Sequence, residues 1–175
     1  DGAGERKVRW GAGNKCNIFV NDSLYQAGRP TALSSNKHYS TAGRMYTKYT
    51  AKHGERSGEN TLFEEISLAE IRAGDLFVTN GDPRPSRSHT EIITAVTGGH
   101  AFYALGAHSE GCYERQYFTN KRIFYAHVES IARRHDKNEE WAAGELDDFR
   151  VDEIAEKYRL ELIDPGEYHF LKLIG

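Results

Sequence analysis

The sequence predicts an α+β domain in which one helix precedes a group of antiparallel strands. Apolar residues with helical spacing follow a glycine-rich start at residues 11–13. Strand-like runs come later in the chain, and a Gly-Gly pair joins two of them. Because the strands follow the first helix as a group and do not alternate with helices, the order of elements favours the α+β class.

The first predicted helix carries a cysteine at its start. Asn14 is a good N-cap, which places Cys16 in the first helical turn, and Gly28 followed by Pro30 ends the helix. The positive end of a helix dipole favours a thiolate, and the N–H groups of a first turn are donors for an oxyanion. Cys16 is therefore a candidate nucleophile. The alternative is a small hydrophobic residue on the buried face of the helix.

The rest of the chain contains further helical and strand-like segments. Residues 31–60 are polar, with a helical part at 42–52, and Ser67 with Glu70 forms a capping box for a short helical turn. Another helix is predicted at residues 151–158, within a highly charged stretch. The predicted strands are residues 75–79, 90–96, 101–107 and 169–174, with weaker candidates at Phe118 and residues 122–128.

The Gly98-Gly99 pair predicts a two-residue hairpin turn, because a type I′ turn needs positive φ at both central positions. Carried along both strands, that register places His89 opposite His108, with Cβ atoms about 4.5–5.5 Å apart on one face. Two neighbouring imidazoles can act as a base and the group that orients it. A slip of one residue would separate them and leave two unrelated surface histidines.

Length, charge and composition argue against several classes of function. A chain of 175 residues with 38% hydrophobic content is long enough for one globular domain with a sizeable core. The net charge of −3 argues against nucleic acid as the main partner. We find neither an apolar run of membrane-spanning length nor a signal peptide in the first residues, and we expect targeting information to lie outside this chain. Cys16 and Cys112 either form one bridge or stay free.

These segments resemble the NlpC/P60 and CHAP branch of the papain-like superfamily. In that family a cysteine begins the first helix, a Gly-Asp pair leads into a strand, a histidine opens the next strand, and a polar residue follows one strand later. Over residues 11–110 those places are occupied by Cys16, Gly74-Asp75, His89 and His108. The nucleophile motif differs from the usual Asp-Cys-Ser/Thr-Gly, since this chain reads Lys15-Cys16-Asn17-Ile18.

The resemblance implies a papain-like fold with a core at residues 11–128 and a charged, helical C-terminal extension at 129–175. It implies a cysteine hydrolase in which Cys16 attacks a peptide carbonyl, His89 is the base and His108 orients His89. The implied substrate is a peptidoglycan peptide, cut without a metal or organic cofactor by a secreted or periplasmic enzyme. The departures point to amidase effectors that bacteria inject into rivals, for which a cognate inhibitor or immunity protein is the expected partner.

Other interpretations of the same residues stay open. Glu91 shares a strand face with His89 and is either the orienter or the partner of a basic side chain. His89, Glu91 and His108 also form a candidate set of zinc ligands. Asn17 is either a cleft residue or a local hydrogen-bonding residue, and we expect Cys112 to be a structural or exposed thiol. Two further function classes are a toxin-like deamidase or acyltransferase acting on a host protein, and a non-catalytic binding module with a cysteine bridge.

Overall fold

The computed structural model describes residues 15–33, 39–51, 61–79, 88–108, 110–135 and 148–174. Within them, four α-helices and one mainly antiparallel sheet confirm the predicted α+β class. The helices are α1 (Cys16–Gln26), α2 (Ala42–Tyr49), α3 (Lys121–His135) and α4 (Asp148–Tyr158). The strands are β1 (Thr50–Ala51), β2 (Phe63–Ile66), β3 (Leu76–Thr79), β4 (His89–Val96), β5 (Ala101–His108), β6 (Gly111–Phe118), β7 (Leu160–Leu162) and β8 (His169–Leu173).

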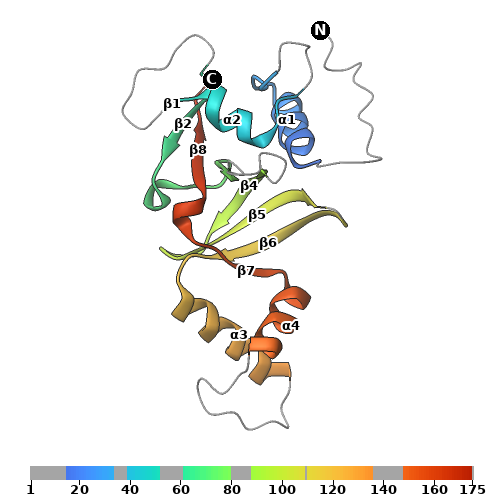
Figure 1. Ribbon diagram of the computed structural model, residues 1–175, viewed down its shortest axis with the longest axis vertical. Helices are drawn as coiled ribbons and strands as arrows, with labels where there is room; N and C mark the ends of the chain where they lie inside the picture. The colour runs from blue at the N-terminus through green and yellow to red at the C-terminus, as the bar shows by residue number, and fades with distance from the viewer. Residues whose placement is uncertain are drawn as a thin grey trace.

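The strands form a single sheet whose order in space differs from their order in the chain. That order is β1-β2-β8-β3-β4-β5-β6-β7, so the last strand lies between β2 and β3 in the middle of the sheet. The outermost pairs, β1–β2 and β6–β7, are parallel, and all other neighbours are antiparallel. The C-terminal residues therefore complete the same sheet that carries the β4–β5 hairpin (Figure 1).

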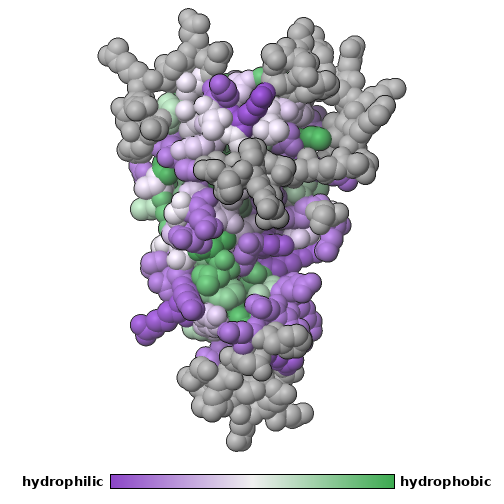
Figure 2. All heavy atoms as spheres, in the orientation of Figure 1, coloured by the Kyte–Doolittle hydropathy of each residue, from purple (hydrophilic) through white to green (hydrophobic). Residues whose placement is uncertain are grey.

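The helices form two pairs, with α1 and α2 at the top of the view in Figure 1 and α3 and α4 at the bottom. In the first pair, Val20 of α1 and Met45 of α2 are buried in one cluster with Val78 of β3. In the second pair, Val128 of α3 and Ile154 of α4 form a separate cluster. On the face shown in Figure 2, hydrophobic side chains gather near the middle, above α3 and α4. Each pair of helices thus has its own apolar contact with the sheet.

A third cluster covers one face of the central strands and is rich in aromatic side chains. Phe77 of β3 contacts Phe102 of β5 and Tyr117 of β6 edge to face, with ring centroids 5.7 and 4.9 Å apart. Ile93 of β4 belongs to the same cluster. Because side chains alternate between the faces of a strand, the odd-numbered residues of β4 up to Ile93 and the even-numbered residues of β5 share this face. Glu91 of β4 lies on the same face and is a polar neighbour of this cluster.

Helix α1 begins and ends close to the predicted residues. Its first residue is Cys16, and its N-cap position is Lys15, which makes no side-chain capping bond. Asn14, the expected cap, lies outside the described residues. At the other end Gly28 has φ +69°, its N–H donates to Tyr25 O, and the Arg29 N–H donates to Leu24 O. This is a Schellman motif, which confirms the predicted C-terminal glycine.

The turn between β4 and β5 differs from the predicted type I′ turn. The Thr97 N–H donates to Ala101 O over 2.9 Å, so the turn contains His100 as well as the two glycines. Gly98 has φ +87°, whereas Gly99 is not among the glycines with positive φ. The prediction of a two-residue turn was therefore wrong, because one more residue enters the loop.

A bulge in β4 restores the register that the longer turn would have lost. The register shifts by one residue at Thr94, between Ile93 and Ala95. Beyond the bulge Ile92 lies opposite Leu105, as the two-residue turn would also have placed it. The extra residue in the turn and the extra residue in the bulge cancel each other. The rings of His89 and His108 consequently lie side by side, with centroids 5.1 Å apart.

Most of the other predictions of secondary structure are confirmed, and one is wrong. The three strands before residue 108 and the final strand are confirmed to within two residues at each end, and the helix at 151–158 is part of α4. The Ser67–Glu70 capping box is also confirmed. The weak strand predicted at residues 122–128 is wrong, because these residues belong to α3. None of the described helices is both long and apolar enough to span a membrane.

Candidate active site

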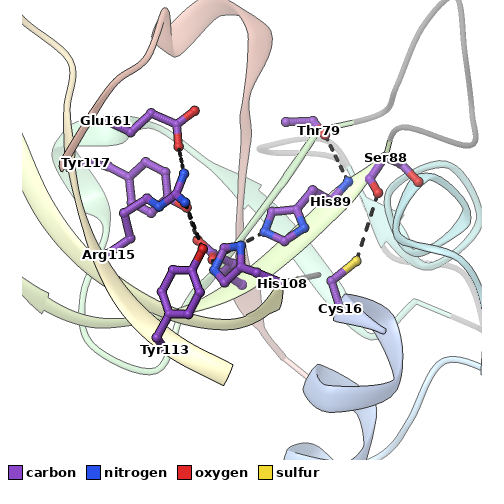
Figure 3. A network of polar contacts seen from close by, with 10 residues as sticks. Cys16, Thr79, Ser88, His89, His108, Tyr113, Arg115, Tyr117 and Glu161 are labelled. Carbon is purple, nitrogen blue, oxygen red and sulfur yellow. Dashed lines mark hydrogen bonds and ion pairs between the residues drawn. The ribbon is translucent and has the colours of Figure 1, made fainter. Parts of the chain in front are cut away.

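Cys16 is held at the point where α1 meets the start of β4. The helix packs across β4 and β5, and the thiol is buried, with 1% of the residue exposed. Its Sγ donates to the carbonyl oxygen of Ser88 over 3.9 Å. Ser88 immediately precedes His89, whose N–H donates to Thr79 Oγ1 over 3.0 Å and ties the start of β4 to the end of β3 (Figure 3).

Glu91 is the most deeply buried charged group of the site. Its carboxylate oxygen Oε1 lies 3.2 Å from His89 Nε2 and 2.6 Å from His108 Nε2, and its side chain is fully buried. The hydroxyl of Tyr117 donates to the other oxygen, Oε2. The carboxylate of Glu91 thus connects His108 of β5 and Tyr117 of β6 with His89, the first residue of β4.

A glycine makes room for this carboxylate. Gly106 lies beside Glu91 on the neighbouring strand, and a Cβ atom at position 106 would lie 2.7 Å from Glu91 Oε1 and 2.9 Å from its Cδ. Both distances are far below van der Waals contact, so any side chain at position 106 would displace the carboxylate. The absence of a side chain at Gly106 is therefore a requirement for Glu91 to reach both histidines.

Electrostatics favour a charged pair at His89 and Glu91. Burial lowers the pKa of His89, but its contacts with Cys16 and Glu91 outweigh burial and raise the pKa to about 9. Burial raises the pKa of Glu91, but its contacts with His108, His89 and Tyr117 outweigh burial and lower the pKa below its usual range. At neutral pH, His89 is accordingly an imidazolium between the thiol and a carboxylate.

Tyr117 keeps its proton in this environment. Burial and the neighbouring charge of Glu91 raise the pKa of Tyr117 far above that of an exposed tyrosine. The phenol is therefore a permanent donor to Glu91 Oε2. A donor that does not titrate near neutral pH keeps the carboxylate ionised and in place, which in turn holds both imidazoles.

A stack of planar groups extends the site outward from His108. The ring of Tyr113 lies parallel to the His108 ring, with centroids 4.1 Å apart and an angle of 16°. The guanidinium of Arg159 lies 4.1 Å from the centre of the Tyr113 ring. Arg115 donates to the Tyr113 hydroxyl over 3.0 Å and pairs with Glu161 at 2.5 Å (Figure 3). Three β6 side chains on one face, at positions 113, 115 and 117, thus support the histidines.

A cavity of about 550 Å³ adjoins the two histidines. Its walls come from the end of β5, the first half of β6, helix α4 and the turn that follows α4. The lining residues are His89, Ala107, His108, Glu110, Tyr113, Arg115, Asp152, Ala155, Glu156, Arg159 and Leu160. Asn17 is not among them, and its Nδ2 instead donates to Ser40 O over 3.0 Å. Cys16 is not among them either, but it contacts His89, which lines the cavity.

The same three groups also satisfy the donor chemistry of a divalent metal. His89 Nε2, His108 Nε2 and a Glu91 oxygen lie within 4.8 Å of one another. Neither Nε2 atom makes a well-directed hydrogen bond, although both lie at ion-pair distance from Oε1. Two imidazole nitrogens and one carboxylate are a ligand set that zinc accepts. The site can thus hold either shared protons or a metal ion, and removing metal distinguishes the two states.

The structure brings together Cys16, His89, Glu91 and His108, which the sequence analysis had named. Cys112 is exposed, and both cysteines are free thiols, which excludes the bridge required by the binding-module alternative. Sequence reasoning missed the support from β6 and α4, above all Tyr117 and Arg159. A signal was present, since aromatic and basic residues alternate at positions 113, 115 and 117, but no strand had been predicted there.

Comparisons with known proteins give one structural similarity. No protein-family model matches the chain, and no curated protein sequence matches it. Among solved structures, the chain is similar to the crystal structure of a wild-type endolysin, LysIME-EF1, with a TM-score of 0.33 and 11% sequence identity. The match covers 87% of this chain and 88% of the endolysin chain. A similarity at this level carries no argument about function, which therefore rests on the site itself.

Proposed function

We propose that this protein is a thiol-dependent hydrolase that cuts amide bonds in peptidoglycan peptides. The observation that carries the proposal is the line of contacts from Cys16 through His89 to Glu91. A thiol at a helix start contacts an imidazole, and that imidazole lies 3.2 Å from a fully buried carboxylate. Nucleophile, base and orienting group in this order are the constellation of cysteine hydrolases.

In the proposed reaction Cys16 and His89 act as a thiolate–imidazolium pair, and the thiolate attacks the substrate carbonyl. The positive end of α1 stabilises the negative charge that develops on the carbonyl oxygen. His89 then donates its proton to the leaving amine as the C–N bond breaks, which leaves a thioester on Cys16. Water, deprotonated by His89, attacks the thioester and releases the carboxylic acid, which leaves the thiolate on Cys16 and the proton on His89.

Glu91 takes the role of orienter in this proposal, and His108 supports Glu91. The carboxylate fixes the position of His89 Nε2 and stabilises the imidazolium, as the third member of a catalytic triad does. His108 contacts that carboxylate at 2.6 Å. Among the described residues, His108 Nε2 makes no hydrogen bond to His89. This assignment follows the alternative in which Glu91, and not His108, orients the base.

The nature of the substrate rests on the resemblance to the NlpC/P60 and CHAP branch. That resemblance favours amide bonds between or beside D-amino acids in the cell wall, an enzyme that acts outside the cytoplasm, and a cognate inhibitor or immunity protein as a partner. The chemistry of Cys16, His89 and Glu91 alone supports amide hydrolysis of any peptide that reaches the site.

Incubation with purified sacculi tests the proposal. We expect soluble muropeptide fragments, identified by mass spectrometry, from the parent protein and from Cys112→Ser, in which the exposed thiol is removed. Cys16→Ala should release none. An intact sacculus together with deamidation or acylation of a host-protein glutamine would assign the chain to the deamidase or acyltransferase class. Fragment release by Cys16→Ala would exclude the thiol mechanism.

A further inference from the structure

Two arginine side chains line the cavity beside the histidines, and they differ in their ion pairing. Arg115 faces the cavity but is paired with Glu161. Arg159 also lines the cavity and is exposed. In the part of the chain that the structure describes, its guanidinium has the Tyr113 ring as its contact, and no carboxylate forms an ion pair with it. Its five N–H donors are therefore open to a ligand.

Arg159 also occupies a backbone conformation that disfavours a side chain. Its φ is +55°, and it is the one non-glycine residue with positive φ among the described residues. It follows the last residue of α4, Tyr158, at the position where helices most often have glycine. An arginine there carries backbone strain, and such strained positions cluster at binding sites.

The strained backbone directs the guanidinium into the stack beside the catalytic groups. Glu156, three residues earlier on α4, is a potential ion-pair partner, yet Arg159 contacts it only through its backbone N–H, which donates to Glu156 O over 3.3 Å. The side chain instead covers Tyr113, whose ring stacks on that of His108. A ligand on Arg159 therefore lies in the same cavity that His89 and His108 line.

The charges around the cavity select the class of ligand. Three carboxylates, those of Glu110, Asp152 and Glu156, line the cavity together with Arg159. Their repulsion disfavours a polyanion such as a nucleic acid or a polyphosphate. A single carboxylate matches the planar fork of one guanidinium, with two parallel charge-assisted hydrogen bonds.

We propose that Arg159 binds a free carboxylate of the peptide substrate and thereby selects peptides that carry such a group near the scissile bond. This inference rests on the proposed function for the identity of the peptide, but the binding it describes does not depend on hydrolysis. The C-terminal segment, through α4 and the turn after it, then supplies the specificity pocket of the site.

Binding in a hydrolysis-deficient background tests the inference. We would measure the Kd of a Cys16→Ala protein by calorimetry for a cell-wall stem-peptide fragment with a free terminal carboxylate and for the same fragment as its C-terminal amide. The free acid should bind at least about tenfold more tightly, since a charge-assisted pair contributes roughly 1.5–3 kcal/mol. Arg159→Gln should abolish this preference, and Arg159→Lys should keep part of it.

Arg150→Gln is the matched control, because Arg150 lies on the same helix, pairs with Glu153 and does not line the cavity. It should keep the full preference. The inference is overturned if neither peptide binds, if acid and amide bind equally, or if Arg159→Gln weakens both by the same factor. If the parent protein fails to hydrolyse the fragment but the preference depends on Arg159, the proposed function fails and this inference stands. If the parent protein hydrolyses the fragment but shows no preference that depends on Arg159, the proposed function stands and this inference fails.

Discussion

Glu91 and Gly106 lie side by side on neighbouring strands, and the carboxylate of Glu91 occupies the space that a side chain at position 106 would fill. This relationship decides whether one buried charge can reach both His89 and His108. The site therefore depends on a residue that has no functional group of its own.

Gly106→Ala should disable the site by displacing Glu91. The added methyl group would overlap the carboxylate, so we expect kcat/KM to fall at least about a hundredfold and the free energy of unfolding to fall by about 1–3 kcal/mol. Gly99→Ala is the control, since nothing lies within 4 Å of a Cβ at that position. Kinetics and urea unfolding measure the two effects. Full activity in Gly106→Ala would show that Glu91 does not need its present position.

Substitutions of His89, Glu91 and His108 should differ in how strongly they lower the rate, and their effects on the rate should not be additive. His89→Ala should abolish turnover as completely as Cys16→Ala, because a general base contributes roughly 10²–10⁴-fold. Glu91→Gln should cost more than His108→Ala, which leaves the Cys16–His89–Glu91 line intact. Once His89 is absent, the second substitution His108→Ala should have little further effect. Single-turnover rates test this, and a harmless Glu91→Gln beside a severe His108→Ala would return the orienter role to His108.

The stability of the fold should depend on pH through His89 and Glu91. The pKa of His89 is about 9 in the folded protein and about 6.5 in an unfolded chain, so its stabilising contribution is complete below pH 6.5 and disappears as pH rises through 9. The pKa of Glu91 is lowered by folding, so its contribution is present above the unfolded value and disappears as pH falls below it.

Unfolding free energies measured from pH 6 to pH 10 test this dependence. The advantage of the parent protein over His89→Asn should be largest near pH 6 and should shrink toward pH 10. Arg150→Gln, which removes the Arg150–Glu153 ion pair on α4, should show no such trend. A constant difference between parent and His89→Asn across this range would mean that His89 gains no proton affinity on folding.

Removal of metal should leave the proposed hydrolytic activity unchanged. Protons satisfy His89, Glu91 and His108 in the proposed mechanism, so prolonged dialysis against a chelator should change kcat/KM less than about twofold. Added Zn²⁺ should inhibit, because it would occupy the imidazole nitrogens that the reaction needs. Loss of activity on chelation, with recovery on addition of Zn²⁺, would assign these three residues to a metal centre.

The parts of the fold that local patterns specify were predictable from the sequence. The helix that begins at Cys16 has its C-terminal glycine, and the strands before residue 108 have short apolar runs. The adjacency of His89 and His108 was also predicted, but for an incomplete reason, because the longer turn and the bulge at Thr94 cancel. Neither irregularity has a local signature strong enough to predict it.

The parts that depend on distant pairing were not predictable. Residues 122–128 contain several residues that favour strands, yet Phe124, Val128 and Ile131 are buried at helical spacing within α3. The central place of β8 depends on contacts with strands more than 90 residues earlier in the chain. The role of Glu91 was undecided because it depends on the space at Gly106. Arg159 acquires its place only when the turn after α4 meets β6, where the Gln116 N–H donates to Arg159 O.

The pH dependence of thiol alkylation tests the central claim, the pairing of Cys16 with His89, most directly. An ordinary exposed thiol in a model peptide, with a pKa of about 8.5, should react about 200-fold faster with iodoacetamide at pH 9 than at pH 6. Cys112, which is free and exposed, is the comparison within the same chain. The account predicts a much flatter profile for Cys16, measured by mass spectrometry of the two cysteine peptides, because the His89 imidazolium contacts the Cys16 sulfur. His89→Ala should make the profile of Cys16 steep, and equally steep profiles for both thiols in the parent protein would contradict the account.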